Sequence, residues 1–122
     1  MKRPIAVLAT CLLLTACGNG PADDAAQAAC RAYGDNPTTS AVRSELRATA
    51  SEQAQRAAEA DDSYAALPRD MADAWSRNDA MAAAHNSGQV VSGEDLDAYF
   101  AADTRVRADC ADAGADLGPL EP

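Results

Sequence analysis

His85 is the first residue to consider for chemistry in this 122-residue sequence, because it is the sole imidazole. A single histidine excludes a metal site built from several histidines. We expect His85 in the last turn of a helix, where a protonated side chain meets the negative end of the helix dipole. The alternative is a catalytic base or a metal ligand. A Cys110–His85 dyad would in addition require an unpaired Cys110 thiol.

Three pairs of adjacent acids are the next candidates. Adjacent residues of a helix do not share a face, and all three pairs lie near expected helix starts, where carboxylates act as caps. We therefore expect solvated or capping roles for Asp23-Asp24, Asp61-Asp62 and Glu94-Asp95. The sequence also lacks a calcium-loop spacing, a glycine-rich phosphate loop, a G-x-S-x-G elbow and an H-E-x-x-H helix. It predicts no catalytic residue, no metal site and no cofactor.

The charge balance narrows the class of partner. The sequence carries 10 Lys and Arg against 19 Asp and Glu, a net charge of −9. A nucleic-acid binder needs a basic face, and a polybasic membrane contact needs clustered cationic residues, so neither is expected. A partner protein with a basic surface is the natural complement.

The first 18 residues resemble the signal and lipobox of bacterial lipoproteins. Residues 1–4 form a short basic segment with Lys2 and Arg3, and residues 5–16 are uncharged and mostly apolar. These twelve residues suit a signal segment, because a mature helix needs roughly 20 to span a bilayer. Leu14-Thr15-Ala16-Cys17 then matches every lipobox position. The resemblance implies that residues 1–16 are removed and that lipid on Cys17 anchors the protein to the extracytoplasmic face of the cell membrane. An ordinary secretory signal, with Cys17 a free thiol, is the alternative.

The cysteines left after such processing predict one disulfide. Cys11 leaves with the signal and Cys17 carries lipid, so Cys30 and Cys110 remain in an exported, oxidising compartment. Two reduced thiols in the core are the alternative. No C-x-x-C motif is present, so thiol–disulfide catalysis has no local support.

Helical patterns cover almost the whole mature chain, and no β-alternation of four or more residues occurs. Capping and breaking residues predict four helices. The first covers about 22–34, and the second begins with Asn36 as N-cap and Pro37 and extends no further than Pro68. The third begins between Ser63 and Asp70 and ends at Asn86-Ser87-Gly88, and the fourth runs from the Ser92 N-cap, in a capping box with Asp95, to Gly114.

Apolar residues three or four positions apart predict the buried faces of the last three helices. These faces comprise Val42, Leu46, Ala50, Ala54, Ala57, Ala60 and Tyr64; Met71, Ala74, Trp75, Asn78, Ala82 and His85; and Leu96, Tyr99, Phe100, Asp103, Val106 and Cys110. We expect the aromatic members Trp75, Tyr99 and Phe100 in the core. An exposed binding patch is the alternative.

Alanine decides whether this composition folds. Removal of residues 1–16 leaves a charge of −11 and few large aliphatic residues, which is a composition typical of disorder. However, 31 of the 122 residues are alanine, which has the highest helix propensity and lets helices approach closely. We predict an all-α fold, a small three- to four-helix bundle with one disulfide. Residues 17–21 form the lipidated tether, 22–113 the helical domain and 114–122 a flexible tail.

The predicted disulfide constrains the helix order. Cys30 and Cys110 each lie about one turn before the end of their helices, and those ends are at opposite poles of a strict up-down-up-down bundle. Bridged cysteines need Cα atoms within roughly 7 Å. We therefore expect that the first helix does not fold straight back on the second. It either crosses the other three or runs parallel to the fourth.

Two functions follow from these observations. The first is a non-enzymatic cell-envelope lipoprotein that binds another protein or a small ligand, similar to the small Ala-rich helical lipoproteins of high-GC bacteria. The second is a carboxylate-dependent enzyme or metal-dependent envelope factor, which a concave site with converging side chains would favour. The sequence favours the first, because no catalytic constellation is found.

Overall fold

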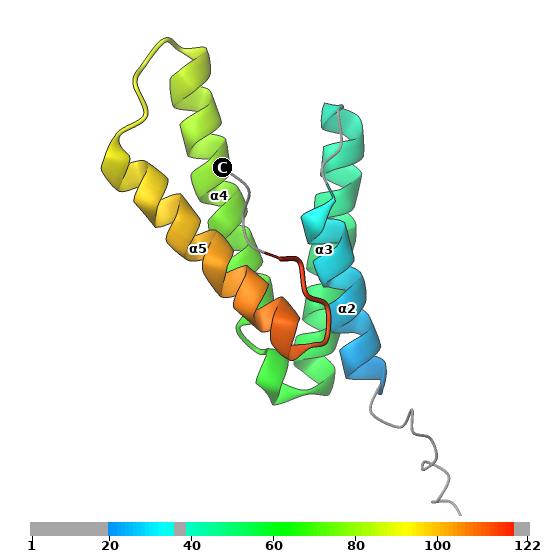
Figure 1. The fold of residues 1–122 in the computed structure, drawn as a ribbon. Coiled ribbons are helices and arrows are strands. Elements are labelled where there is room, and N and C mark those ends of the chain that lie inside the picture. Colours follow the sequence, from blue (N-terminus) through cyan, green and yellow to red (C-terminus); the bar gives the residue numbers. More distant parts are fainter. Residues whose placement is uncertain (1–19, 36–38, 119–122) are drawn as a thin grey trace, which may run out of the picture.

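The fold consists of two helical hairpins joined by a disulfide (Figure 1). A computed structural model describes residues 20–35 and 39–118. Its elements are α2 (Pro21–Gly34), α3 (Ser40–Ala60), the short 3₁₀-helix η1 (Asp62–Tyr64), α4 (Leu67–Asn86) and α5 (Gly93–Asp112). The predicted all-α fold with one disulfide is confirmed. Residues 1–16, the lipobox and Cys17 lie outside the described residues.

Most helix ends lie where the local sequence predicts them. Pro68 stands in the first turn of α4, and Gly88, with φ of +82°, follows the end of that helix. The Ser92 hydroxyl accepts a hydrogen bond from the Asp95 N–H at 3.1 Å and caps α5, which Gly114 terminates with φ of +90°. A positive φ favours glycine because it has no Cβ.

The predicted start of the second helix was wrong. α3 begins at Ser40, and its N-cap is Thr39, whose hydroxyl accepts a hydrogen bond from the Val42 N–H at 3.3 Å. Threonine is nearly as good a cap as asparagine, so the choice between them depends on where the chain can turn. Asn36 and Pro37 lie outside the described residues.

Alanine packs the first hairpin, as the composition predicts. The side chains at its interface are almost all methyl groups, and all are buried: Ala25, Ala26 and Ala29 on α2, and Ala50, Ala54 and Ala57 on α3. Larger side chains complete the core from α4 and α5, chiefly Leu67, Met71 and Val106. Small side chains let two helix axes lie close together, so α2 and α3 share a long contact.

The expected direction of the first helix was also wrong. α2 runs antiparallel to α3, with the Tyr64 hydroxyl donating to Asp23 at the shared end, and the four helices alternate up, down, up and down (Figure 1). The expected direction holds only for helices that are equal in length and nearly parallel. In fact α2 has 14 residues and α5 has 20, about 21 and 30 Å. α5 also runs obliquely, so that its C-terminal end reaches the side of α2 (Figure 1).

The disulfide joins the two hairpins at this crossing. Cys30 and Cys110 are buried, with their Cα atoms 5.7 Å apart. The Gln27 amide donates to the Ala113 carbonyl at 2.9 Å beside them. Away from this end, the hairpins diverge (Figure 1).

The buried faces predicted from periodicity are correct near the disulfide and wrong far from it. Val42, Leu96 and Phe100, all expected to be buried, are 40–44 % exposed. Trp75 and Tyr99 are half-buried. The predicted faces continue along the whole length of each helix. Because the hairpins diverge before the helices end, the residues beyond that point have no neighbouring hairpin to cover them.

The segment after Gly114 runs back along the helices. The Arg107 guanidinium donates to the carbonyls of Leu117 and Gly118 at 3.1 and 2.9 Å. Leu117 lies against Gly34, where a Cβ would come within 3.0 Å of its Cδ2. In the part of the chain that the structure describes, no helix is long and apolar enough to cross a membrane.

Candidate functional site

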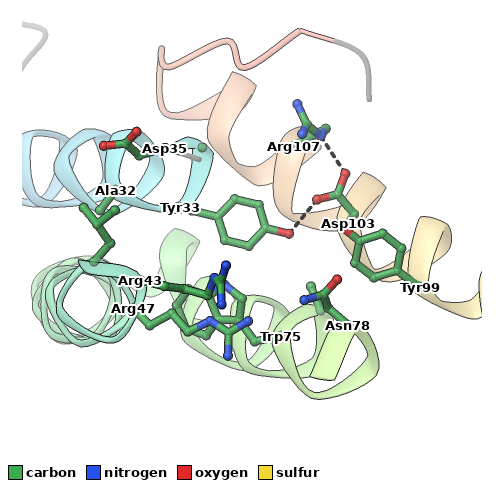
Figure 2. A pocket seen from close by; sticks show the side chains of 13 residues that line it. Ala32, Tyr33, Asp35, Arg43, Arg47, Trp75, Asn78, Tyr99, Asp103 and Arg107 are labelled. Atoms are coloured by element: carbon green, nitrogen blue, oxygen red, sulfur yellow. Dashed lines mark hydrogen bonds and ion pairs between the residues drawn. The ribbon is translucent and has the colours of Figure 1, made fainter. Parts of the chain in front are cut away.

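A cleft of about 270 Å³ lies between the two hairpins, and all four α-helices contribute to its lining (Figure 2). It begins about one helical turn from the disulfide, where the hairpins start to diverge. Its lining consists of aromatic, charged and small residues: Ala32, Tyr33, Gly34, Asp35, Arg43, Leu46, Arg47, Ala74, Trp75, Asn78, Tyr99, Asp103 and Arg107.

Aromatic rings form one part of the cleft. Tyr33 of α2 and Trp75 of α4 face each other across the gap, with ring centroids 5.8 Å apart and planes tilted by 35°. Both lie at the edge of the core and are half-buried, because the diverging hairpins leave one side of each ring uncovered. Flat apolar surface that water can reach is typical of a binding site for a ring or hydrocarbon group.

Two arginines of α3, Arg43 and Arg47, line the cleft near Trp75 (Figure 2). The Arg47 guanidinium carbon lies 5.5 Å from the ring centroid, a cation–π contact, and its Nη1 is 2.9 Å from Asp79 Oδ2. Arg43 is one turn earlier on the same face. Its guanidinium makes no ion pair or hydrogen bond with any residue in 20–35 or 39–118.

Asp103 is a buried carboxylate that ties the two hairpins together at the cleft. It is 2 % exposed, accepts the Tyr33 hydroxyl at 2.6 Å and pairs with Arg107 Nε at 2.6 Å. Burial and the bond to Asp103 raise the pKa of Tyr33 above its ordinary value, so its hydroxyl remains a donor. Burial also raises the pKa of Tyr99. Because two partners already satisfy Asp103, this carboxylate holds the cleft wall in place.

Two lining side chains offer polar atoms to an occupant. The Asn78 amide and the Tyr99 hydroxyl make no hydrogen bond within the described part of the chain. Together with Arg43, they supply donors and an acceptor that face a partly enclosed space. The described lining contains no histidine, cysteine, serine or lysine, so nucleophilic chemistry has no obvious agent here. The arrangement is suited to holding a polar, flat molecule.

A second, smaller cavity of about 240 Å³ contains an acid pair. It is lined by Ser63, Tyr64, Leu67, Asp109 and Asp112. Burial, then the hydrogen bond to Asp70 and its charge, raises the pKa of Asp109 to about 7. Asp109 Oδ2 is buried with no hydrogen-bond partner among the described residues. At neutral pH the Asp109 carboxyl can hold or release a proton.

The residues singled out by sequence are not brought together. His85 lies in the last turn of α4, as expected, but its side chain is exposed although it shares the face predicted to be buried. Residues 20–35 and 39–118 contain no group of three or more His, Cys, Asp or Glu side chains that could hold a metal ion. The acidic pairs begin helices: α2, η1 and α5. Asp61 caps η1, and its hydrogen bonds to Ser63 lower the pKa of that carboxyl.

Of the cleft residues, the sequence singled out Trp75 and Tyr99, as core residues or as an exposed binding patch, but it did not predict a cleft. Asp103 was assigned to the buried face of its helix, and an acid among apolar positions was the signal that it needed a buried partner. Arg43 and Arg47, like charges four residues apart on one helix, were a second signal. That these arginines lie near Trp75 could be predicted only from the way the hairpins pack.

Comparison with protein-family models, curated proteins and solved structures finds no match to this chain.

Proposed function

We propose that this protein is a lipid-anchored, extracytoplasmic binding protein that holds a small ligand in the cleft between its hairpins. The observation that carries the proposal is the cleft itself. Its lining includes the half-buried Trp75 ring and the Arg43 and Asn78 side chains, whose polar groups have no hydrogen-bond partner among the described residues. Leu14-Thr15-Ala16-Cys17 supports the anchor and the compartment. The disulfide agrees with an oxidising environment.

Binding fits the lining better than catalysis does. A concave site with converging side chains would favour an enzyme. In this cleft, however, the buried acid Asp103 is already bonded to Tyr33 and Arg107. A general base must be able to reach the substrate and accept a proton from it. What the cleft leaves available is an arginine, an amide and a phenol, which bind rather than transfer protons at neutral pH.

Native mass spectrometry tests the binding proposal. The protein is extracted from the envelope of its host in mild detergent and should carry a small-molecule adduct. Trp75→Ala and the cleft-filling variant Asn78→Trp should both lose the adduct, provided that each keeps the wild-type helical signal. Phe100→Ala, which removes an exposed aromatic ring outside the cleft, should keep it. An adduct that persists in both cleft variants would contradict the proposal.

The anchor has its own test. Cys17→Ala should release the protein from membranes or leave an uncleaved precursor, because the thiol is the site of lipid attachment in the lipobox. Fractionation and intact-mass measurement separate these outcomes. A fully processed Cys17→Ala protein that still pellets with membranes would exclude lipid as the anchor.

A carboxylate-dependent enzyme is the second candidate, and the Asp70–Asp109 pair is the observation that favours it. Two carboxyls that share a proton can activate water, as in acid proteases. Hydrolysis of a fluorogenic peptide library between pH 5 and 7 is the test. The activity should disappear in Asp109→Asn and remain in Asp97→Asn, which changes an exposed acid of the same helix.

A further inference from the structure

We propose that the ligand of the cleft is a small organic anion, a flat ring that carries a carboxylate or phosphate group. The anionic group lies at Arg43 and Arg47, and the ring lies beside Trp75. This inference rests on the proposed binding function and gives its ligand a chemical class.

Charge is the first argument. The chain has 19 acids, and its arginines are mostly matched to them: Arg56 with Glu52, Arg77 and Arg105 with Asp73, Arg107 with Asp103. Arg43 faces the cleft and has no acidic partner among the described residues. Among the described arginines, Arg31 and Arg43 have no ion pair, and only Arg43 lines the cleft. An anionic ligand would supply the missing partner.

The position of Arg47 is the second argument. Arg43 and Arg47 are one turn apart on α3, and like charges at this spacing repel each other. Arg47 is kept over the Trp75 ring by the cation–π contact and by Asp79. Nη1 of Arg47 is bonded to Asp79, and its other N–H groups make no hydrogen bond with the described residues, so they can donate to a carboxylate or a phosphate. Two such groups on one face therefore form an anion site.

The aromatic part of the lining argues for a ring. The Tyr33 and Trp75 rings present flat surface, while the Asn78 amide and the Tyr99 hydroxyl can bond polar substituents (Figure 2). A volume of about 270 Å³ is at the lower end for small-molecule sites, so the ligand is compact. Asp103 does not repel the anion strongly, because Arg107 neutralises its charge.

Trp75 provides the measurement, because it is the sole tryptophan of the chain. Its indole N–H gives one identifiable signal in a ¹H–¹⁵N NMR spectrum of the full protein in detergent. The probes are 4-hydroxybenzoate, phenyl phosphate, inorganic phosphate and the uncharged 4-hydroxybenzamide. Both charged ring compounds should shift the signal, and 4-hydroxybenzamide should bind at least about tenfold more weakly. The tighter of the two ring compounds identifies the anionic group as carboxylate or phosphate. Inorganic phosphate, which lacks the ring, should bind more weakly than phenyl phosphate.

Matched variants complete the test. Arg43→Gln should weaken binding of the charged ring compounds about tenfold or more and leave that of 4-hydroxybenzamide unchanged. Arg56→Gln, an exposed arginine of the same helix, should change neither. Equal binding of 4-hydroxybenzamide and 4-hydroxybenzoate, unaffected by Arg43→Gln, would overturn the anion inference and leave the binding function intact. If no probe shifts Trp75, the inference fails, and the adduct measured by native mass spectrometry decides the binding function independently.

Discussion

The two hairpins are held together by different physics. Within the first, α2 and α3 meet through alanine methyl groups, and no ion pair joins these two helices among the described residues. Within the second, acids and arginines link α4 to α5: Arg105 pairs with Asp73 at 2.9 Å, and Asp70 shares a hydrogen bond with Asp109. One hairpin depends on close packing, and the other depends partly on charge.

This difference explains where the molecule can carry a site. Closely packed methyl groups leave no space and offer no polar atoms, so the α2–α3 interface is structural. Buried charged side chains need partners or water, so they lie beside the cavities and not within the alanine interface. Both cavities accordingly include α5 residues: Tyr99 and Asp103 in the larger, Asp109 and Asp112 in the smaller.

Separating the hairpins should have the largest effect. The Cys30–Cys110 disulfide closes a loop with a sequence separation of 80, which corresponds to about 4.5 kcal/mol of loop entropy in the chain-entropy model. Cys110→Ser should lower Tm by well over about 10 °C, since 1 kcal/mol is worth about 4–8 °C in a domain of this size. Thermal unfolding followed by circular dichroism measures it. The double variant Cys30→Ser/Cys110→Ser should unfold at about the same temperature as the single one. A much smaller loss would mean that the interhelical contacts alone join the hairpins.

Overpacking the first hairpin should come next. Ala54 is fully buried between α3 and its neighbours, so Ala54→Leu forces the closely packed helices apart and should cost about 1–3 kcal/mol. Ala48→Leu, on the exposed face of α3, should change the free energy of unfolding by less than about 0.5 kcal/mol. Urea unfolding of both variants gives the comparison. Equal changes in the free energy of unfolding for the two variants would show that the α2–α3 interface is not closely packed.

Neutralising the acid pair should stabilise the second hairpin, in a pH-dependent way. The pKa of Asp109 is about 7 in the folded protein and about 3.9 when unfolded, so the folded state holds an extra proton between these values. Stability from this group is therefore present at low pH and is lost as pH rises toward 7. Asp109→Asn removes that loss. Because Asp109 is partly exposed, we expect a gain of about 1 kcal/mol at pH 8, or about 4–8 °C in Tm, and little change at pH 4. Tm measured across this range checks it, and a pH-independent difference would contradict the shared proton.

The exposed ion pair of the second hairpin should contribute least. Arg105 is 52 % exposed, and its pairing with Asp73 is open to screening. Arg105→Gln should cost about 0.5 kcal/mol at low ionic strength and nothing measurable in 1 M salt, where the Debye length is about 3 Å. Urea unfolding at two salt concentrations measures this. A cost that survives high salt would indicate a packing role for the arginine stem.

The sequence alone determined the features that depend on neighbouring residues. Gly88, Ser92 and Gly114 mark helix ends correctly, because caps and turns involve residues within about four positions of each other. Pro68 was the predicted limit of the second helix, but α3 ends earlier, at Ala60. Elimination among four cysteines identified the bonded pair. Alanine richness likewise predicted a helical core of small side chains.

Only the tertiary structure decided how the helices meet. Periodicity tells which residues of one helix share a face, but it does not give the length at which two hairpins diverge or the angle at which α5 crosses α2. For this reason the predicted direction of α2 was wrong, and Phe100 was expected in the core but is exposed. The cleft depends on the same quantities: Tyr33, Arg43, Trp75 and Asp103 come from four helices, and only the divergence of the hairpins leaves them around one open space.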